Sequence, residues 1–297
     1  RDPLWSRGLG DVYKRQQPDL PEVSRAARPH LLVIDAQNDF CDIPGASLPV
    51  PGADADMHRL AAFIRRHLPD IGRITLTLDS HYRIDIAHPG FWRTAEGTAV
   101  PPFTAIGLQD VREGRFLPRD VQALPQVQAY LAALESRGRY THMVWPVHCE
   151  LGTWGHNLHA EVAAACGAWE DLHGLQADKV LKGLNPWTEH YSAIEAEVPL
   201  PGDASTQTNR ALLDSLAGSG PVIVAGEAGS HCVKATLEHL VRELPASRLV
   251  LLTDAISPVP GFETQQSQIF DALAAQGARR VRTDEWRLDD LGSVPAT

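Results

Sequence analysis

The sequence predicts an α/β protein in which a mainly parallel, doubly wound sheet lies between two layers of helices, a three-layer α/β/α arrangement. Two observations predict it. From about residue 30 onward, short apolar runs alternate with amphipathic stretches, and the runs are hydrophobic at nearly every position, as in Pro221-Val-Ile-Val-Ala-Gly226. A strand buried on both faces has this continuous pattern, whereas a strand with one wet face alternates. The amphipathic stretches between the runs supply the crossovers that parallel pairing requires.

The expected strands are the runs rich in β-branched and aliphatic residues. In chain order they span residues 30–34, 73–78, 142–145, 179–182, 221–225, 248–252 and, more weakly, 280–282. Helices are expected between them at 55–68, 121–135, 158–168, 205–217, 232–244 and 263–276. In the first of these, Met57, Leu60, Ala61, Ile64 and Leu68 recur at spacings of three and four, which places them on one core-facing stripe.

Segment 89–140 is rich in Pro and Gly and holds one clear helical pattern. A connection of that length is commonly a lid or an oligomer contact. We therefore expect a single domain over 28–290 with an insertion at about 89–140, assembled as a homo-oligomer. Residues 1–17 lack periodicity and resemble translated adapter sequence, so segment 1–20 is expected to be disordered or extraneous.

Composition excludes several classes of function. The chain has 297 residues, of which 43% are hydrophobic and 22% charged, and a formal net charge of -10. Without a cluster of Lys and Arg, no nucleic-acid or anionic-membrane partner is expected, and no apolar run is long enough to span a bilayer. The cysteines (Cys41, Cys149, Cys166 and Cys232) form no C-x-x-C pair, which disfavours a zinc ribbon or a disulfide framework and favours the cytoplasm.

The polar residues that follow the expected strands are the candidate site. In open α/β sheets ligands bind at the carboxyl ends of the strands, so these side chains should meet at one edge. They are Asp35, Asp79, His81, His148, Lys182 and the turn 227–232.

Asp35, Lys182 and Cys232 supply a base, a cation and a nucleophile at this edge. Cys232 lies where a strand turns into a helix, and the backbone N–H groups of a helix start stabilise a thiolate and an oxyanion. Asp35 can take the thiol proton, while the Lys182 ammonium favours the thiolate. Each residue alone has an ordinary explanation, as a buried thiol, a turn cap or a solvated strand end. Their convergence favours a nucleophilic site.

Asp79-Ser-His81 and His148 suggest a metal site at the same edge. Alternate residues of extended chain point to one side, so Asp79 and His81 can share a ligand. One carboxylate and two imidazoles leave coordination positions open, as in catalytic metal centres. The expected ion is divalent, zinc first, with iron or manganese as alternatives. Histidines with no metal role remain the other interpretation.

Five motifs in order together resemble the isochorismatase-like cysteine hydrolases, most closely the nicotinamidases. The motifs are His30-Leu-Leu-Val-Ile-Asp-Ala-Gln-Asn-Asp-Phe40, Asp79-Ser-His81, Trp145-Pro-Val-His148-Cys149, Lys182-Gly183 and Gly226-Glu-Ala-Gly-Ser-His-Cys232. The resemblance covers residues 30–256 and implies the same three-layer fold. The chain departs from it in its greater length and in the Glu-Ala-Gly-Ser turn, where nicotinamidases commonly have a Thr-Asp pair.

The resemblance also implies residue roles. Asp35, Lys182 and Cys232 fall on the catalytic triad, and Asp79, His81 and His148 fall on metal ligands, with His88 matching an additional ligand of some members. A cis peptide between Glu227 and Ala228 would let the amides of Ala228 and Cys232 form an oxyanion hole. Phe40, Trp145 and Tyr191 match aromatic walls of the substrate pocket.

The activity that the resemblance implies is hydrolysis of a small carboxamide, nicotinamide to nicotinate and ammonia, through a thioester on Cys232. Alternatives are another amide or carbamoyl substrate, isochorismatase activity, or a non-catalytic binding module on the same fold. A nucleotide-binding oxidoreductase is disfavoured, because the first strand is followed by Asp-Ala-Gln-Asn-Asp rather than a G-x-G-x-x-G turn.

Overall fold

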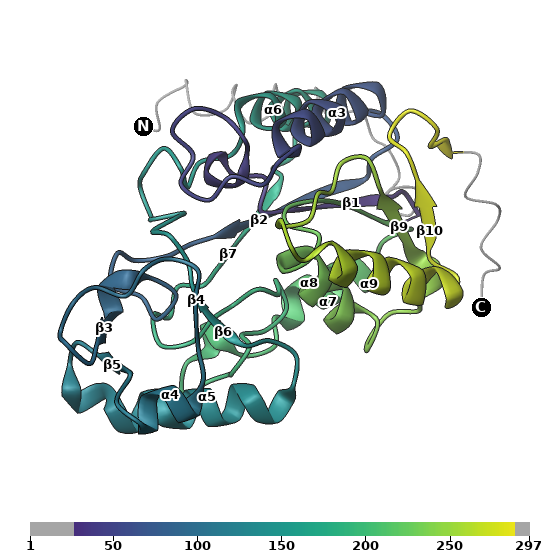
Figure 1. Ribbon diagram of the computed structural model, residues 1–297. Helices are drawn as coiled ribbons and strands as arrows, with labels where there is room; N and C mark the ends of the chain where they lie inside the picture. The colour runs from purple at the N-terminus through teal and green to yellow at the C-terminus, as the bar shows by residue number, and fades with distance from the viewer. Residues whose placement is uncertain (1–26, 289–297) are drawn as a thin grey trace, which may run out of the picture.

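The computed structural model describes residues 27–288, and the segment 1–20 that we expected to be extraneous lies outside this range. The predicted α/β/α fold is confirmed. A six-stranded sheet has the order β10-β9-β8-β1-β2-β7 (Figure 1), and all of its strand pairs are parallel. Its strands are β1 (His30–Ile34), β2 (Arg73–Asp79), β7 (Asp178–Lys182), β8 (Val222–Gly226), β9 (Leu249–Leu252) and β10 (Arg279–Val281).

Two layers of helices cover this sheet. Helices α3 (Ala53–Arg66) and α6 (Ala160–His173) lie on one face, and α7 (Arg210–Ala217), α8 (Cys232–Leu240) and α9 (Glu263–Ala275) lie on the other (Figure 1). Alternate residues of β1 divide between the two cores: Leu31 and Val33 pack in the α3/α6 layer, and Leu32 and Ile34 in the α7/α8/α9 layer. Burial on both faces explains why the central strands are continuously apolar.

Segment 89–140 packs on a hydrophobic cluster that is separate from the two cores of the main sheet and also includes Ile86, Val144 and Val198. The segment contains β3 (Trp92–Thr94), β4 (Thr104–Ile106), α4 (Leu108–Arg112), β5 (Phe116–Pro118) and α5 (Leu124–Arg137). Trp92, Val127 and Leu131 belong to this cluster, under α5. The one helix expected here is α5. The short α4 was missed, because a five-residue helix has too few positions to show a helical period.

The strand expected at 142–145 does not join the main sheet. It forms β6 (His142–Val144), which pairs antiparallel with β4. Its middle residue, Met143, is half-buried, unlike the fully buried central strands.

The boundaries of some helices differ from the expected ones. α7 begins at Arg210, because the side chain of Asn209 caps it by accepting a hydrogen bond from Leu212 N at 3.0 Å.

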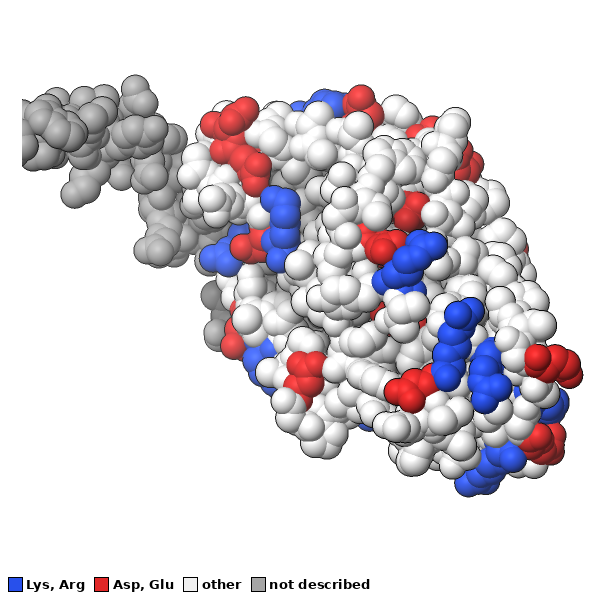
Figure 2. Space-filling view, turned by 90° about the vertical axis from the view of Figure 1, so that its left-hand side faces the viewer, with Lys and Arg blue, Asp and Glu red and all other residues white. Residues whose placement is uncertain are grey.

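Surface charges of both signs are interspersed on the face that Figure 2 shows. Exposed ion pairs such as Arg65 with Glu161, at 2.7 Å, reflect the same mixing. Among the described residues, no helix combines the length and the hydropathy needed to cross a membrane.

Gly226 closes β8 immediately before the candidate nucleophile turn, and its backbone requires glycine. Its φ is 117°, and an added Cβ would overlap the backbone of Ile34 on β1. We expect Gly226→Ala to lower the free energy of unfolding by about 3 kcal/mol, because the backbone strain of alanine at a positive φ adds to the steric clash of its Cβ with Ile34. Denaturant titration measures this loss.

Gly97→Ala is the matched control. Gly97 has a φ of 82° but no atom within 4 Å of an added Cβ, so it should lose only about 1 kcal/mol. Equal losses in the two variants would contradict the role assigned to the contact with Ile34.

Candidate active site

The carboxyl ends of four neighbouring strands bring the candidate residues together. Asp79 and Lys182 end β2 and β7 and are paired in register, while Asp35 follows β1 and Cys232 begins α8 after β8. Parallel strands end at the same edge, so residues nearly two hundred positions apart meet there. All four side chains are buried.

The Lys182 ammonium lies at the centre of the group. Its Nζ is 2.8 Å from Asp35 Oδ2 and 2.9 Å from Asp79 Oδ1, and it donates to the carbonyl of His190 at 3.0 Å. Cys232 Sγ lies 3.5 Å from the same nitrogen. Burial alone would lower the pKa of Lys182, but the two carboxylates raise it well above its ordinary value. Lys182 is therefore a permanent cation.

Cys232 is a protonated thiol in this environment. Burial raises its pKa well above the ordinary value; Lys182 opposes the shift, and Asp35 and Asp79 add to it. Lys182 favours the thiolate, as expected, but burial and the carboxylates outweigh it. A thiolate would have to form by proton transfer to a neighbouring base, and the adjacent Asp35 is the candidate for that base.

Asp35 is held by its neighbours in the position this transfer needs. Thr77 Oγ1 donates to Asp35 Oδ1 at 2.6 Å, and Asp35 N donates to Thr77 O at 3.2 Å. The φ of Asp35 is 45°, in the left-handed region that Asp tolerates better than most residues. Burial raises the pKa of Asp35, and Lys182 opposes that shift.

The turn before Cys232 contains the expected cis peptide between Glu227 and Ala228. Among the described residues, neither Ala228 N nor Cys232 N has a hydrogen-bond acceptor, so both amides are available to a ligand oxygen. Glu227 fixes the turn to the segment after β9, since its Oε2 accepts a hydrogen bond from Ser257 N at 3.1 Å. Burial raises the pKa of Glu227 well above its usual range, and the neighbouring Asp56 adds to this shift.

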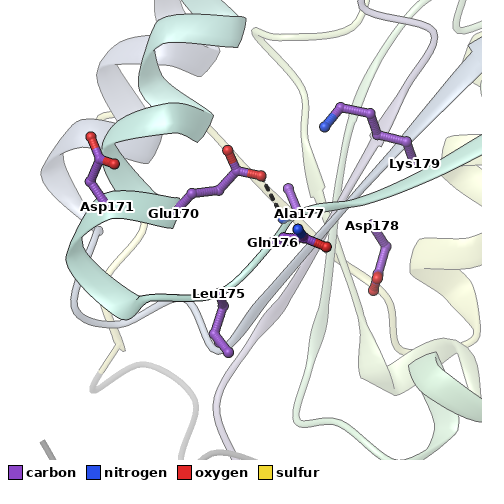
Figure 3. Close-up of a pocket in the computed structure, with 7 residues that line it drawn as sticks. All are labelled: Glu170, Asp171, Leu175, Gln176, Ala177, Asp178 and Lys179. Atoms are coloured by element: carbon purple, nitrogen blue, oxygen red, sulfur yellow. Dashed lines mark hydrogen bonds between the residues drawn. The ribbon is translucent and has the colours of Figure 1, made fainter. Parts of the chain in front are cut away.

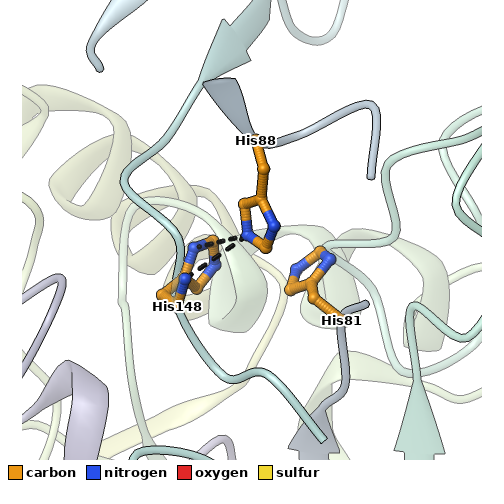
Figure 4. Close-up of side chains that lie close together, drawn as sticks. All are labelled: His81, His88 and His148. Carbon is orange, nitrogen blue, oxygen red and sulfur yellow. Dashed lines mark hydrogen bonds between the residues drawn. The ribbon is translucent and has the colours of Figure 1, made fainter. Parts of the chain in front are cut away.

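Three histidines converge (Figure 4), and Asp79 lies beside two of them. The ligand atoms of His81, His88 and His148 lie within 4.8 Å of one another. Asp79 Oδ2 is 3.1 Å from His81 Nε2 and 3.4 Å from His148 Nε2. His88, the additional ligand that the resemblance implied, belongs to this cluster, with its Nε2 3.3 Å from His148 Nδ1.

These residues fit a divalent metal by the chemistry of their donors. His81 Nδ1 is 3.0 Å from Asp85 Oδ2 and His88 Nδ1 is 3.1 Å from Tyr82 O, which leaves each Nε2 facing the centre. Outer partners of this kind orient the imidazoles of metal sites. Burial, with the neighbouring histidines, lowers the pKa of His88 to about 2, so its ring is neutral. Its Nε2, which accepts a hydrogen bond from His148 N at 3.4 Å, carries the lone pair that a metal would use. Nitrogen and carboxylate donors suit zinc, iron or manganese.

A small cavity of about 30 Å³ opens beside Cys232 and Asp79. The expected aromatic residues Phe40, Trp145 and Tyr191 all line it, and Trp145 Nε1 donates to Tyr191 Oη at 3.1 Å. Leu48, Val50 and Val259 add aliphatic walls, so the cavity is bounded mainly by aromatic and aliphatic side chains.

Several residues at the site escaped sequence reasoning. Glu189 also lines the cavity, and burial raises its pKa to about 7. Asp85 follows His81 by four residues, a spacing that could have suggested a partner for its imidazole. Glu189 and Thr77 lie in segments with no motif, so their roles depend on the folded chain.

A larger hollow, of about 710 Å³, lies at the other end of β7 (Figure 3). It is lined by Glu170, Asp178 and Lys179 among others, and Glu170 Oε1 accepts from Ala177 N at 2.8 Å. Because Asp178 begins β7 and Lys182 ends it, this hollow opens at the amino edge of the sheet and is separate from the candidate site.

Comparisons with known proteins place the fold. No protein-family model and no curated protein sequence matches the chain. Among solved structures, it is similar to an Acinetobacter baumanii nicotinamidase and pyrazinamidase, with a TM-score of 0.58 and 20% identity over 87% of this chain and 97% of that one.

Two further structures are similar. The yeast nicotinamidase Pnc1p bound to the inhibitor nicotinaldehyde has a TM-score of 0.58 and 21% identity over 86% of this chain and 99% of that one. PnC1 from L. infantum in complex with nicotinate has a TM-score of 0.55 and 20% identity over 87% and 94%. At these identities the comparison establishes a shared fold, that of the nicotinamidase structures.

The contact between His81 and Asp85 makes the metal site testable. We expect Asp85→Asn to weaken binding of Zn²⁺ about 10- to 100-fold, because the amide no longer orients His81 as a carboxylate does. Competition with a chelator of known affinity, followed by elemental analysis, measures the change.

Asp70→Asn is the matched control, since Asp70 Oδ2 lies 2.9 Å from His67 Nδ1 in a histidine–carboxylate pair outside the cluster. It should leave the affinity of the site unchanged. If the Asp85→Asn protein bound Zn²⁺ as tightly as the parent, Asp85 would have no role in orienting His81 as a metal ligand.

Proposed function

We propose that the protein is a metal-assisted cysteine amidohydrolase of the isochorismatase-like family that hydrolyses a small carboxamide, with nicotinamide as the leading substrate. The observation that carries the proposal is the position of Lys182 Nζ, within 2.9 Å of both Asp35 and Asp79 and 3.5 Å from Cys232 Sγ. Structures of similar fold include nicotinamidases bound to nicotinaldehyde and to nicotinate, which supports a pyridine substrate.

The acylation step begins with proton transfer from Cys232 to Asp35. The thiolate attacks the carboxamide carbon, a C–S bond forms, and the carbonyl oxygen becomes an oxyanion. The amides of Ala228 and Cys232 donate to that oxygen, and Lys182 stabilises the negative charge on sulfur. Asp35 then returns the proton to the leaving nitrogen, the C–N bond breaks, and ammonia departs.

Water completes the cycle by hydrolysing the thioester. Asp35, again a carboxylate, takes a proton from the attacking water, and the collapse of the second oxyanion breaks the C–S bond to release nicotinic acid and the thiolate. In solvent the acid gives its proton to the released ammonia, which leaves nicotinate and ammonium. The proton on Asp35 returns to Cys232. The same base and the same oxyanion donors therefore serve both half-reactions.

Asp79, His81, His88 and His148 would hold the divalent metal, which supplies Lewis acidity and a coordination position for a ring nitrogen or a water. The aromatic residues Phe40, Trp145 and Tyr191 would position a flat ring next to it. We further propose that 28–290 is one domain in which segment 89–140 is an insertion.

Cys232→Ala should abolish release of ammonia from nicotinamide, because Cys232 is the one thiol among the described residues that line the cavity. Ammonia detection across a panel of small amides measures this, and circular dichroism and metal content should match the parent. Cys166→Ala, at a buried thiol in the α3/α6 core, is the matched control and should remain active. Ammonia release at the parent rate by the Cys232→Ala protein would contradict the mechanism.

A further inference from the structure

A second chamber of about 240 Å³ adjoins the small cavity at Cys232. We call it the outer chamber. The two spaces share Tyr191 and His231 as lining residues, so these side chains form the partition between them. The other walls come from the end of segment 89–140, from α8 and from the start of α9: Arg139, Tyr140, Thr141, Met143, Ser230, Lys234, Phe262 and Gln265.

Aromatic rings line the outer chamber around His231. The His231 ring is 4.8 Å from Phe262 and stacks on Tyr140 at 6.0 Å, with 25° between the planes. Tyr140 is in turn 4.8 Å from Tyr191. A chamber walled by flat rings suits a flat or slender group.

Two cations face the same chamber, while the carboxylates that pair with them do not line it. Arg139 is neutralised by Glu197 at 2.9 Å and Glu238 at 2.8 Å. Lys234 Nζ is 2.6 Å from Glu238 Oε1. Of the described residues that line the chamber, Arg139 and Lys234 are charged and none is acidic.

Lys234 has bonding capacity left for a ligand. Within the described chain its ammonium contacts Glu238 and the Tyr140 hydroxyl, the latter at 3.5 Å, and lies 4.8 Å from the Tyr140 ring centroid. Three N–H groups are available on an ammonium, so one remains. Burial, with a smaller contribution from Lys234, lowers the pKa of His231 to about 4. The His231 ring is therefore neutral, and Lys234 supplies the positive charge near the partition between the two spaces.

The Tyr140 hydroxyl links Lys234 to the nucleophile turn. It lies 3.5 Å from both Lys234 Nζ and the carbonyl of His231, the residue before Cys232. Lys234 therefore lies close to the nucleophile turn, in the space on the far side of Tyr191 and His231 from the small cavity.

We propose that the outer chamber is a second subsite, and that the protein prefers an elongated aromatic amide with a carboxylate at the end remote from the carboxamide. The proposal rests on the proposed function, since it places the amide at Cys232. It assigns Lys234 to the carboxylate, the rings of Tyr140 and Phe262 to the connecting part, and the end of segment 89–140 to substrate selection.

Binding to the Zn²⁺-loaded Cys232→Ala protein tests the subsite without turnover. The probes are nicotinamides that carry alkyl carboxylates of increasing length on the ring carbon meta to the carboxamide, each paired with its methyl ester. Calorimetry should give a carboxylate of matching length at least about tenfold tighter binding than its ester, the size expected for a charge-assisted hydrogen bond. Adding Lys234→Gln should remove that preference, and Lys234→Arg should retain most of it.

Two further variants separate a specific contact from a general loss of charge. Glu238→Gln removes the competing carboxylate and should increase the preference for the carboxylate probe. Lys179→Gln removes an exposed lysine at the amino end of β7 and should change the preference less than twofold. Equal binding of acid and ester at every length, or a preference that survives Lys234→Gln, would overturn the proposal.

The outcome is separable from that of the proposed function. A carboxylate preference that depends on Lys234, in a protein whose parent form releases no ammonia, would support the subsite and refute the reaction. Release of ammonia from nicotinamide without any carboxylate preference would support the reaction and refute the subsite.

Discussion

The buried ammonium of Lys182 is the constraint on which the rest of the site depends. An uncompensated charge in a protein interior costs several kcal/mol, and breaking a buried ion pair typically costs 3–5 kcal/mol. Lys182 avoids this cost because Asp35, Asp79 and the His190 carbonyl lie within 3.0 Å of it. These partners come from the ends of β1 and β2 and from the segment after β7. The register of the sheet and the electrostatics of the site therefore stabilise each other.

The two carboxylates that neutralise Lys182 differ in their other contacts. Asp35 faces the thiol and is held by Thr77, whereas Asp79 offers one oxygen to Lys182 and the other to His81 and His148. Asp79 thus joins the candidate metal site to the candidate nucleophile. Loss of the Asp79 charge would affect both, because Lys182 and the imidazoles depend on the same side chain. Segment 89–140 adds to this centre from outside, through Arg139 and Tyr140 at its end.

Much of this arrangement could be predicted from the sequence. Strands buried on both faces leave continuous apolar runs, so β1, β2, β8 and β9 were found with nearly correct ends, and the rule that parallel strands end together placed Asp35, Asp79 and Lys182 at one edge. The pairing of β6 could not be predicted, because a three-residue strand carries too little pattern to specify its partner. Asp85, Glu189 and the outer chamber depend on contacts between distant segments, which no local pattern encodes.

In the proposed mechanism Cys232, assisted by Asp35 and Lys182, forms a covalent thioester. Acid quenching during turnover of nicotinamide, followed by mass spectrometry of the proteolysed protein, tests this step most directly. We expect a pyridine-3-carbonyl group on the peptide that contains Cys232, present during turnover and gone when the substrate is exhausted. Steady release of ammonia with Cys232 unmodified at every time point, or with the acyl group on another residue, would contradict it.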